Sequence, residues 1–326
     1  MFLRAAWAAA TAACIGLLAA APAAVRAADW PQRPVTMVVP FPAGGPTDLV
    51  ARVLARQLTG QLGQTVVVEN RGGANGNIGM QHVAQTAADG YTLLYNTSSI
   101  ALSPNLYTKL GFDPQRAFQA VTSTAVIPLV LLVHPSVPAK DIQSFIAYAK
   151  AQGGKLTYAS ASTGNVTHLG ALMLLRAVGA QAMHVPYRGS APAMTDLVGG
   201  QVQFMTNTLN DSLAFVRDGK LRALAVTGSQ RSPLLPNVPT VAETVKPGFE
   251  VGAWQGVVVP KGTPPEIVAR LNREILKALQ TDEVRKQLAA QGAQVLGSTP
   301  EAYQQYIRDE TQRWGEVIRE AGVKLD

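Results

Sequence analysis

A pair of glycines, Gly44 and Gly45, lies in the loop between the first predicted strand and the first predicted helix. The run Pro40-Phe-Pro-Ala-Gly-Gly-Pro-Thr-Asp48 follows the β-branched segment 35–39 and precedes apolar residues at helical spacing over 49–58. Glycines let a backbone approach a ligand closely, and the free N–H groups of a helix's first turn bind anions without a basic side chain. The alternative is an ordinary tight turn, with Thr47 as the N-cap and Asp48 as a favourable first-turn acid.

A second polar loop, Ser160-Ala-Ser-Thr-Gly-Asn165, lies between a predicted strand over 156–159 and a predicted helix over 166–178. Its hydroxyl and amide side chains, together with backbone N–H groups, are suited to holding a carboxylate. Because α/β folds bind ligands at the carboxyl ends of their strands, both loops are expected to face one cleft. The alternative is that these residues only cap the helix. His168, one turn into that helix, is interpreted as a structural histidine, since no second group completes a catalytic constellation.

Motifs that would indicate catalysis are missing from the sequence. It contains no G-x-S-x-G nucleophile elbow, no H-E-x-x-H zinc motif and no close histidine pair. The glycines at 73, 76 and 79 fit neither the dinucleotide fingerprint nor the phosphate-binding P-loop. The sequence therefore predicts no metal and no cofactor, and it makes an enzyme the least favoured class.

The composition is that of a globular chain. Its 326 residues are 47% hydrophobic and 15% charged, which predicts about two domains and excludes disordered or collagen-like classes. The 28 Lys and Arg are scattered among 21 acids without a basic run, so a nucleic-acid partner is not expected.

The first 27 residues have the pattern of a secretory signal peptide. Met1 to Arg4 is a short positive start, an apolar run follows to Ala21, and small residues at Val25 and Ala27 suit cleavage near Ala27. Removing Arg4 and Arg26 leaves 26 basic against 21 acidic residues, a net charge of +5. The lone Cys14 leaves with the same segment, and no later apolar run reaches the ~18 residues of a membrane span. The mature chain is expected to be a soluble, thiol-free monomer in the periplasm.

Strand-like and helix-like segments alternate along the rest of the chain, which predicts an α/β fold with two sheets flanked by helices. Three helical stretches after residue 265 lack a sheet of their own and are expected to pack back onto the first domain. Domain 1 is therefore predicted to be discontinuous, with residues 28–124 plus 253–326, and domain 2 to be 125–252. The two chain crossings between them would form a hinge.

Several motifs, in order along nearly the whole mature chain, resemble one family. They include the glycine run 39–48, Val68-Glu-Asn-Arg-Gly-Gly-Ala-Asn-Gly-Asn-Ile-Gly79, His184-Val-Pro-Tyr-Arg-Gly189, Pro236-Asn-Val-Pro239 and Trp254-Gln-Gly256. The chain is similar to the Bug family, the periplasmic solute-binding proteins of tripartite tricarboxylate transporters. The resemblance implies a two-domain Venus flytrap of type II-like topology that grips a small carboxylated ligand between two loops.

Those loops match residues 41–47 and 160–165, and a third segment follows the predicted strand 202–206. Many relatives have Phe-Asp-Asn there, whereas this chain has Thr206-Asn-Thr208, so an amide replaces an acid and a cationic amine ligand is less favoured. The alternative is that Asn207 and Thr208 only end a strand. The candidate ligand-binding residues are Phe41, Ala43, Gly44, Gly45, Thr47, Ser160, Ser162, Thr163, Gly164, Asn165, Asn207 and Thr208.

The function expected from this resemblance is capture of a small organic carboxylate for integral membrane transporter subunits, without chemistry. The alternative is a ligand receptor that feeds a two-component sensor. Aromatic, dicarboxylic and amino-acid ligands all remain open, because backbone donors recognise any carboxylate.

Overall fold

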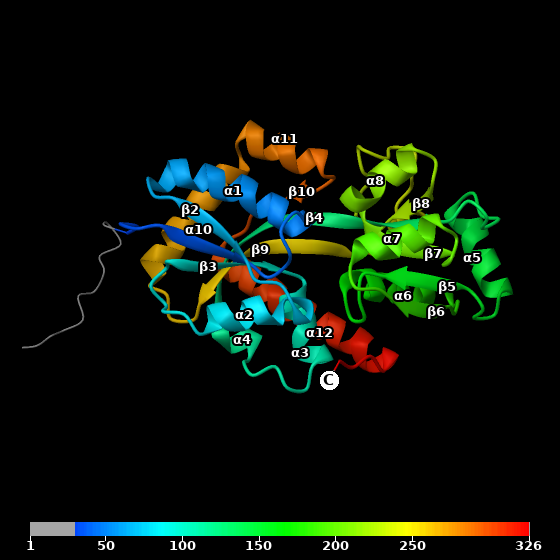
Figure 1. Ribbon diagram of the computed structural model, residues 1–326, viewed down its shortest axis with the longest axis horizontal. Coiled ribbons are helices and arrows are strands. Elements are labelled where there is room, and N and C mark those ends of the chain that lie inside the picture. The colour runs from blue at the N-terminus through cyan, green and yellow to red at the C-terminus, as the bar shows by residue number, and fades with distance from the viewer. Residues whose placement is uncertain (1–29, 326) are drawn as a thin grey trace, which may run out of the picture.

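The computed structural model describes residues 30–325 as a mixed sheet flanked by helices (Figure 1). The expected signal peptide lies outside the described residues. The strands are β1 (Val35–Val39), β2 (Val66–Asn70), β3 (Thr92–Thr97), β4 (Phe118–Val133), β5 (Thr157–Ser160), β6 (Met183–Pro186), β7 (Phe204–Thr208), β8 (Arg222–Val226), β9 (Gly252–Pro260) and β10 (Gln294–Val295). The helices are α1 (Pro46–Leu62), η1 (Ala74–Gly76), α2 (Asn77–Ala84), α3 (Ser99–Leu106), α4 (Pro114–Ala117), α5 (Ile142–Ala151), α6 (Val166–Val178), α7 (Ser190–Val198), α8 (Leu209–Arg217), α9 (Val241–Thr244), α10 (Pro265–Leu279), α11 (Asp282–Ala290) and α12 (Pro300–Ala321).

The long strand β4 joins two groups of strands. The order is β2-β1-β3-β9-β4-β7-β5-β6, and β8 and β10 also pair with β4. Residues 118–128 of β4 pair with β9, whereas residues 129–133 pair with β7 and β8. Within the groups, β1 is parallel to β2 and β3, and β5 is parallel to β6 and β7. In Figure 1, β4 and β9 run through the middle of the molecule, between the helices of the two ends.

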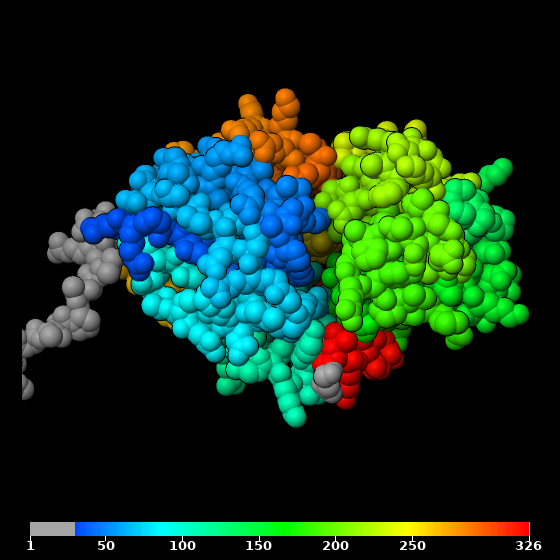
Figure 2. Space-filling view, in the orientation of Figure 1, coloured from blue at the N-terminus to red at the C-terminus, as the bar shows by residue number. Residues whose placement is uncertain are grey.

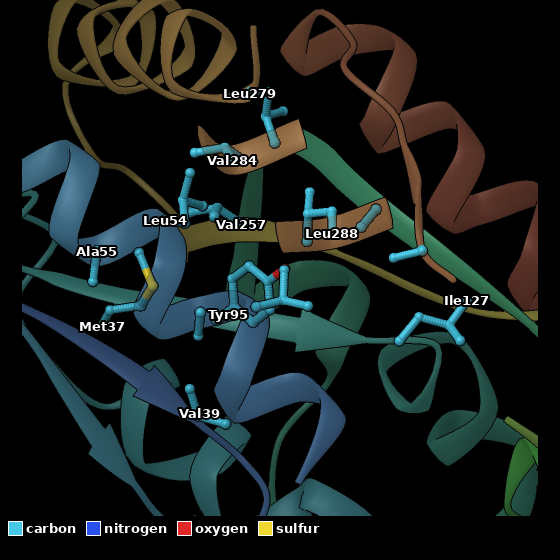
Figure 3. Close-up of a cluster of buried hydrophobic side chains, with 14 of the residues drawn as sticks. Met37, Val39, Leu54, Ala55, Tyr95, Ile127, Val257, Leu279, Val284 and Leu288 are labelled. Atoms are coloured by element: carbon cyan, nitrogen blue, oxygen red, sulfur yellow. The ribbon is translucent and has the colours of Figure 1, made fainter. Parts of the chain in front are cut away.

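A buried apolar cluster unites the two ends of the chain in one core. Met37 of β1, Leu54 of α1 and Val257 of β9 are at most 1% exposed. Leu279 of α10 and Leu288 of α11 lie in the same cluster, which Figure 3 shows at close range. Alternate strand residues and one face of each helix thus pack together, and burial of such side chains is the main stabilising term. The C-terminal helices α10, α11 and α12 pack mainly against α1, α3 and β4.

Helix starts are fixed by local hydrogen bonds. At α5 the Asp141 carboxylate accepts from Ser144 N at 2.7 Å while Ser144 Oγ accepts from Asp141 N at 3.1 Å, which is a reciprocal capping box. At α12 the Thr299 hydroxyl accepts from Ala302 N at 3.2 Å, and Gly322 ends the helix in the left-handed region. These hydrogen bonds fix the first residue of both helices.

Candidate ligand-binding site

A cavity of about 620 Å³ lies where the two groups of strands meet. Its lining comes from residues 41–47, 49, 75, 97–99 and 102 on one side, residues 161–162, 165–167, 188–192, 207–208 and 210–211 on the other, and residues 253 and 255 of β9. Figure 2 shows a furrow where the blue and cyan segments of the chain meet the green ones. The volume is typical of a small-molecule site.

The glycine loop brings the start of α1 to this cavity. The helix begins at Pro46 with Gly45 as its N-cap, so Thr47 lies inside the first turn and the alternative with Thr47 as the cap is wrong. Gly44 has a φ of +81°, which favours glycine, whereas Gly45 has an ordinary φ of −77°. No side chain caps this helix. Its first-turn N–H groups, which have no carbonyl of a preceding turn, are oriented for an anion in the cavity.

A buried carboxylate holds the glycine loop in place. Asp48, 2% exposed, accepts through Oδ2 from Gly44 N and from Arg52 Nε, both at 2.9 Å. Asn70 Nδ2 donates to Asp48 Oδ1 at 2.9 Å and to the carbonyl oxygen of Phe41 at 3.1 Å. Burial opposes ionisation, but the hydrogen bonds from Arg52, Gly44 and Asn70 outweigh it and lower the pKa of Asp48. The loop is therefore pre-organised.

Replacing that carboxylate should loosen the loop. In Asp48→Asn the new amide N–H₂ group must face other donors, either those of Gly44 and Arg52 or that of Asn70, and cannot form a hydrogen bond with them. We therefore expect the free energy of unfolding to fall by about 1–3 kcal/mol at neutral pH. Because the folded pKa of Asp48 lies below its ordinary 3.8, the wild-type carboxylate stabilises the fold above that pH and the benefit is lost as pH falls through the lower value.

Denaturant titration at several pH values tests this expectation. Asp218→Asn is the matched control, because Asp218 is exposed and pairs only loosely with Lys220, at 3.6 Å. The control should change stability by less than about 0.5 kcal/mol. An Asp48→Asn protein as stable as wild type at neutral pH would contradict the loop-clamp role.

The second polar loop forms the opposite edge of the cavity. Asn165 is the N-cap of α6 and accepts from Thr167 N at 3.0 Å, while Thr167 Oγ1 accepts from Ala161 N at 3.0 Å. Ser160, 0% exposed, donates to the carbonyl oxygen of Ser162 at 3.1 Å and lies 2.6 Å from His184 Nε2. Capping thus occurs, as the alternative supposed, yet Ser162, Asn165 and Thr167 also line the cavity.

A buried histidine, His168, and a partly buried one, His184, pack against this loop. The rings of His168 and His184 stack with centroids 3.8 Å apart, and Gly164 N donates to His168 Nδ1 at 3.1 Å. Burial, and then the neighbouring His184, lowers the pKa of His168 to about 3, and burial lowers the pKa of His184 to about 4. Both rings are therefore neutral at pH 7, which fits a structural role for His168.

The end of β7 contributes a third part of the wall. Asn207, 1% exposed, donates through Nδ2 to Ser190 Oγ at 2.9 Å, and Ser190 Oγ lies 3.3 Å from Asn207 Oδ1. Asp211, one turn further along the chain in α8, lines the same cavity. Although residue 207 is an amide, the carboxyl group of Asp211 lies in the same wall. The replacement of an acid by Asn207 is therefore no argument against a ligand with a cationic group.

Nine of the twelve candidate residues line the cavity: Phe41, Ala43, Gly44, Gly45, Thr47, Ser162, Asn165, Asn207 and Thr208. Ser160, Thr163 and Gly164 do not, and the place a Gly164 side chain would take is filled by Leu106 and Leu325. Sequence reasoning missed polar lining residues, namely Asn75, Thr97, Ser98, Ser99, Thr167, Arg188, Ser190, Asn210, Asp211 and Gln255. Arg188 lies within a motif that carried the resemblance, but the helix that holds Asp211 was not expected.

The described part of the chain shows neither a candidate metal centre nor a helix that could span a membrane. Residues 30–325 hold no group of three or more His, Cys, Asp or Glu side chains arranged to bind a metal ion. Within the same residues, no helix combines the length and the apolar character that crossing a bilayer requires.

Two strand groups that share β4 and face one cavity define a class, the two-domain periplasmic binding proteins. The solved structure of the periplasmic binding protein BugD matches with a TM-score of 0.79 and 38% identity, covering 90% of this chain and 99% of that one. This confirms the predicted α/β Venus flytrap fold.

The chain belongs to the tripartite tricarboxylate transporter receptor family, because the model of the "Tripartite tricarboxylate transporter family receptor" matches residues 50–323. It is 43% identical over 305 residues to the protein BugT of Bordetella pertussis (strain Tohama I), covering 93% of this chain and 94% of BugT. A solved structure of R. palustris Rpa4515 with adipate matches with a TM-score of 0.82 and 38% identity, over 91% of this chain and 99% of that one. The resemblance to the Bug family is thereby confirmed.

Proposed function

We propose that this chain is a periplasmic solute-binding protein that captures a small organic carboxylate and delivers it to integral membrane transporter subunits. The observation that carries the proposal is that the starts of α1 and α6, from the two strand groups, meet at one cavity. Both starts present backbone N–H groups, and both adjoin small or polar residues. The adipate bound to Rpa4515 is a small organic acid of the kind that such donors recognise.

The free energy of capture would come from two sources. Convergent N–H and hydroxyl donors would bind the carboxylate, and Phe41 would offer an apolar contact beside them. A micromolar dissociation constant corresponds to about −8 kcal/mol. The loops are held by internal hydrogen bonds before the ligand arrives, so little ordering cost opposes binding.

We also propose the domain division predicted from the sequence, 28–124 plus 253–326 and 125–252. Its support is the change of pairing partner along β4, which leaves β9 after Pro128 and joins β7 at Leu129, close to the proposed crossing. The other crossing coincides with the start of β9 at Gly252. Bending of these two strands would close the cavity over a ligand, and the membrane partner would distinguish the closed surface from the open one.

We also propose that the protein binds its ligand without catalysing a reaction. The nearest approach to a nucleophile and base is Ser160 Oγ with His184 Nε2, at 2.6 Å. Ser160 is 0% exposed and His184, with its pKa lowered to about 4 by burial, is a weak base at neutral pH. The pair is therefore inaccessible to a substrate in the cavity.

Export should remove about 27 residues and leave a periplasmic monomer without thiols. The reasons are the signal pattern and the position of Cys14, the chain's one cysteine. Intact-mass measurement on periplasmic protein should give a chain that begins at Ala28. Retention of Cys14, or added mass from a lipid on it, would contradict this expectation.

Thermal unfolding in the presence of a panel of carboxylates and matched neutral amides tests the proposed function. A true ligand at 100 times its Kd stabilises the folded state by about 2.7 kcal/mol, so some acids should raise the midpoint and their amides should not. Uptake of the stabilising acid by cells with and without this chain then separates transport from delivery to a sensor. A panel without any stabilising acid would contradict capture of a carboxylate.

A further inference from the structure

A second cavity, of about 400 Å³, lies on the other face of β9 from the candidate ligand-binding site. This rear cavity is lined from β4, from β9 and the segment before it, and from α12 and the loop before it, by residues 123, 126, 250, 252, 254, 296–298, 302, 303, 306, 310 and 313. Alternate residues of a strand point to opposite faces of a sheet. Accordingly, Gly252 and Trp254 line the rear cavity, whereas Ala253 and Gln255 line the other one. Among residues 30–325 the two cavities share no lining residue.

Aromatic rings form one wall of the rear cavity. The Trp254 ring meets the Tyr303 ring edge to face, with centroids 6.1 Å apart and an interplanar angle of 87°. It meets the Tyr306 ring in the same way, at 5.2 Å and 74°. Tyr306 is 40% exposed, and Leu296, in the same cavity, is 38% exposed. Exposed apolar side chains that gather in a hollow indicate a ligand with an apolar body, and the faces of such rings attract cations.

Two of the charged groups in the rear cavity are bonded to the protein itself. The Glu310 carboxylate, 6% exposed, accepts through Oε2 from the indole Nε1 of Trp254 at 3.0 Å and of Trp314 at 2.9 Å. Its Oε1 accepts from Arg313 Nη1 at 2.9 Å. Arg313 Nη2 donates to the carbonyl oxygen of Glu250. This acid and this base therefore neutralise each other within the wall.

The carboxylate of Glu250 is the remaining charge of the rear cavity. It is exposed, and within residues 30–325 it belongs to no ion pair. Burial raises the pKa of Tyr306, and the carboxylates of Glu310 and Glu250 raise it further. Arg313 opposes that rise, with a smaller effect than Glu310 alone. The charged groups together thus make the potential in this cavity negative, which favours a cation and disfavours an anion.

We propose that the rear cavity binds a small organic ammonium ion. Its charge lies against the Glu250 carboxylate and the ring of Tyr306, and its apolar body lies against Leu296 and Val126. A carboxylate would meet two acids there, and a neutral molecule would lack the attraction of the acid and the rings. The ion would also contact β4 and β9, the strands proposed to bend on closure. This site is separate from the one proposed for a carboxylate, and the inference does not rest on that function.

Benzylamine and benzyl alcohol are matched probes, because both carry a benzyl group and at neutral pH they differ in bearing an ammonium or a hydroxyl group. Nuclear magnetic resonance titration of the mature wild-type protein should give a Kd of about 1 mM or lower for benzylamine and at least about fivefold weaker binding of the alcohol. Benzylamine should shift the indole N–H signal of Trp254. The signal of Trp30, which lies outside the cavity, should stay in place.

Variants at exposed positions test the two parts of the site. Glu250→Gln should reduce the preference for the amine over the alcohol to less than about twofold. Tyr306→Ala should weaken benzylamine at least about threefold, whereas Tyr306→Phe, which keeps the ring, should bind it as wild type does. Glu316→Gln is the matched control for charge, since Glu316 is exposed on α12 and lies outside the cavity. Gly45→Val, which alters the other cavity, should also bind benzylamine normally.

Several outcomes would overturn the inference. They are equal affinity for the amine and the alcohol, an unmoved Trp254 signal, a preference that survives Glu250→Gln, and unchanged binding in Tyr306→Ala. Loss of benzylamine binding in Gly45→Val would place the amine in the other cavity and would overturn the inference as well. Each of these results leaves carboxylate capture intact, because the panel of acids tests that function separately.

Discussion

Replacing Gly45 by valine is expected to abolish ligand binding while the protein stays folded. Gly45 is the N-cap of α1 and lines the cavity, where we propose that its backbone approaches the ligand carboxylate. A Cβ atom there would meet only the carbonyl oxygen of Pro42, at 3.5 Å, and φ is −77°, so the fold tolerates a side chain. We expect a loss of at least about 100-fold in affinity, ~2.7 kcal/mol, in titration calorimetry.

The melting temperature of this variant should change little, because valine is only a poorer N-cap than glycine, by roughly 1 kcal/mol or less. Gly60→Val is the matched control, since Gly60 lies in the same helix, outside the cavity, with nothing within 4 Å of an added Cβ. The control should bind normally. A folded Gly45→Val protein with full affinity would remove the glycine loop from the site.

Asn207→Asp should lower affinity for an acidic ligand at least tenfold, about 1.4 kcal/mol, at neutral pH. The new carboxylate would share the cavity wall with Asp211 and face a site that receives a carboxylate, and like charges at ~4–6 Å repel by a few kcal/mol at an effective dielectric of ~20. Ligands that carry an ammonium group should gain relative to simple acids. Calorimetry at about pH 7.5 and about pH 5.5 measures both effects.

Acid should reverse the effects of this substitution. Position 207 is 1% exposed, so burial raises the pKa of the introduced carboxyl in the folded state. Stability is therefore reduced at neutral pH and recovers as pH falls through the raised value, and affinity recovers with it, whereas an effect of volume does not titrate. Asn237→Asp makes the same charge change at an exposed site outside the cavity and should leave affinity unchanged. Unchanged affinity in Asn207→Asp at neutral pH would place Asn207 outside the site.

The elements that the sequence predicts best are those with strong local signals. The helix predicted over 166–178 is confirmed to the residue, since it combines an N-cap residue with apolar residues at helical spacing. The first part of the long strand β4 is not predicted from the sequence, because polar residues, including Thr122 and Thr124, interrupt its apolar pattern. Those side chains are buried by pairing with β9 and by the loop before α12, contacts that depend on residues far along the chain.

Two helices beside the cavity, α3 and α8, were not predicted. The segment of α3 follows Tyr95 and contains Pro104, which breaks the helical pattern in sequence, yet it is held between the sheet and α12. The segment of α8 begins with Leu209-Asn-Asp211, a sequence typical of a turn. Because this helix was not predicted, Asp211 was not among the candidate ligand-binding residues.

The candidate site, like the fold, was predicted only where the local sequence is informative. Both helix starts could be found locally, from glycines, hydroxyls and amides before apolar runs, and nine of the candidate residues there and at the end of β7 line the cavity. The local sequence did not reveal which of these side chains are buried or hydrogen-bonded to other parts of the protein. Ser160 is buried against His184 and Asn207 is bonded to Ser190, partners 24 and 17 residues away.

Native mass spectrometry of the mature protein, incubated with a panel of small carboxylates and followed by identification of the released ligand, tests the central claim most directly. The account predicts a complex of one acid per chain, from which the acid is released chemically unchanged. Failure of every carboxylate to form such a complex, or recovery of a converted product in place of the added acid, would contradict it.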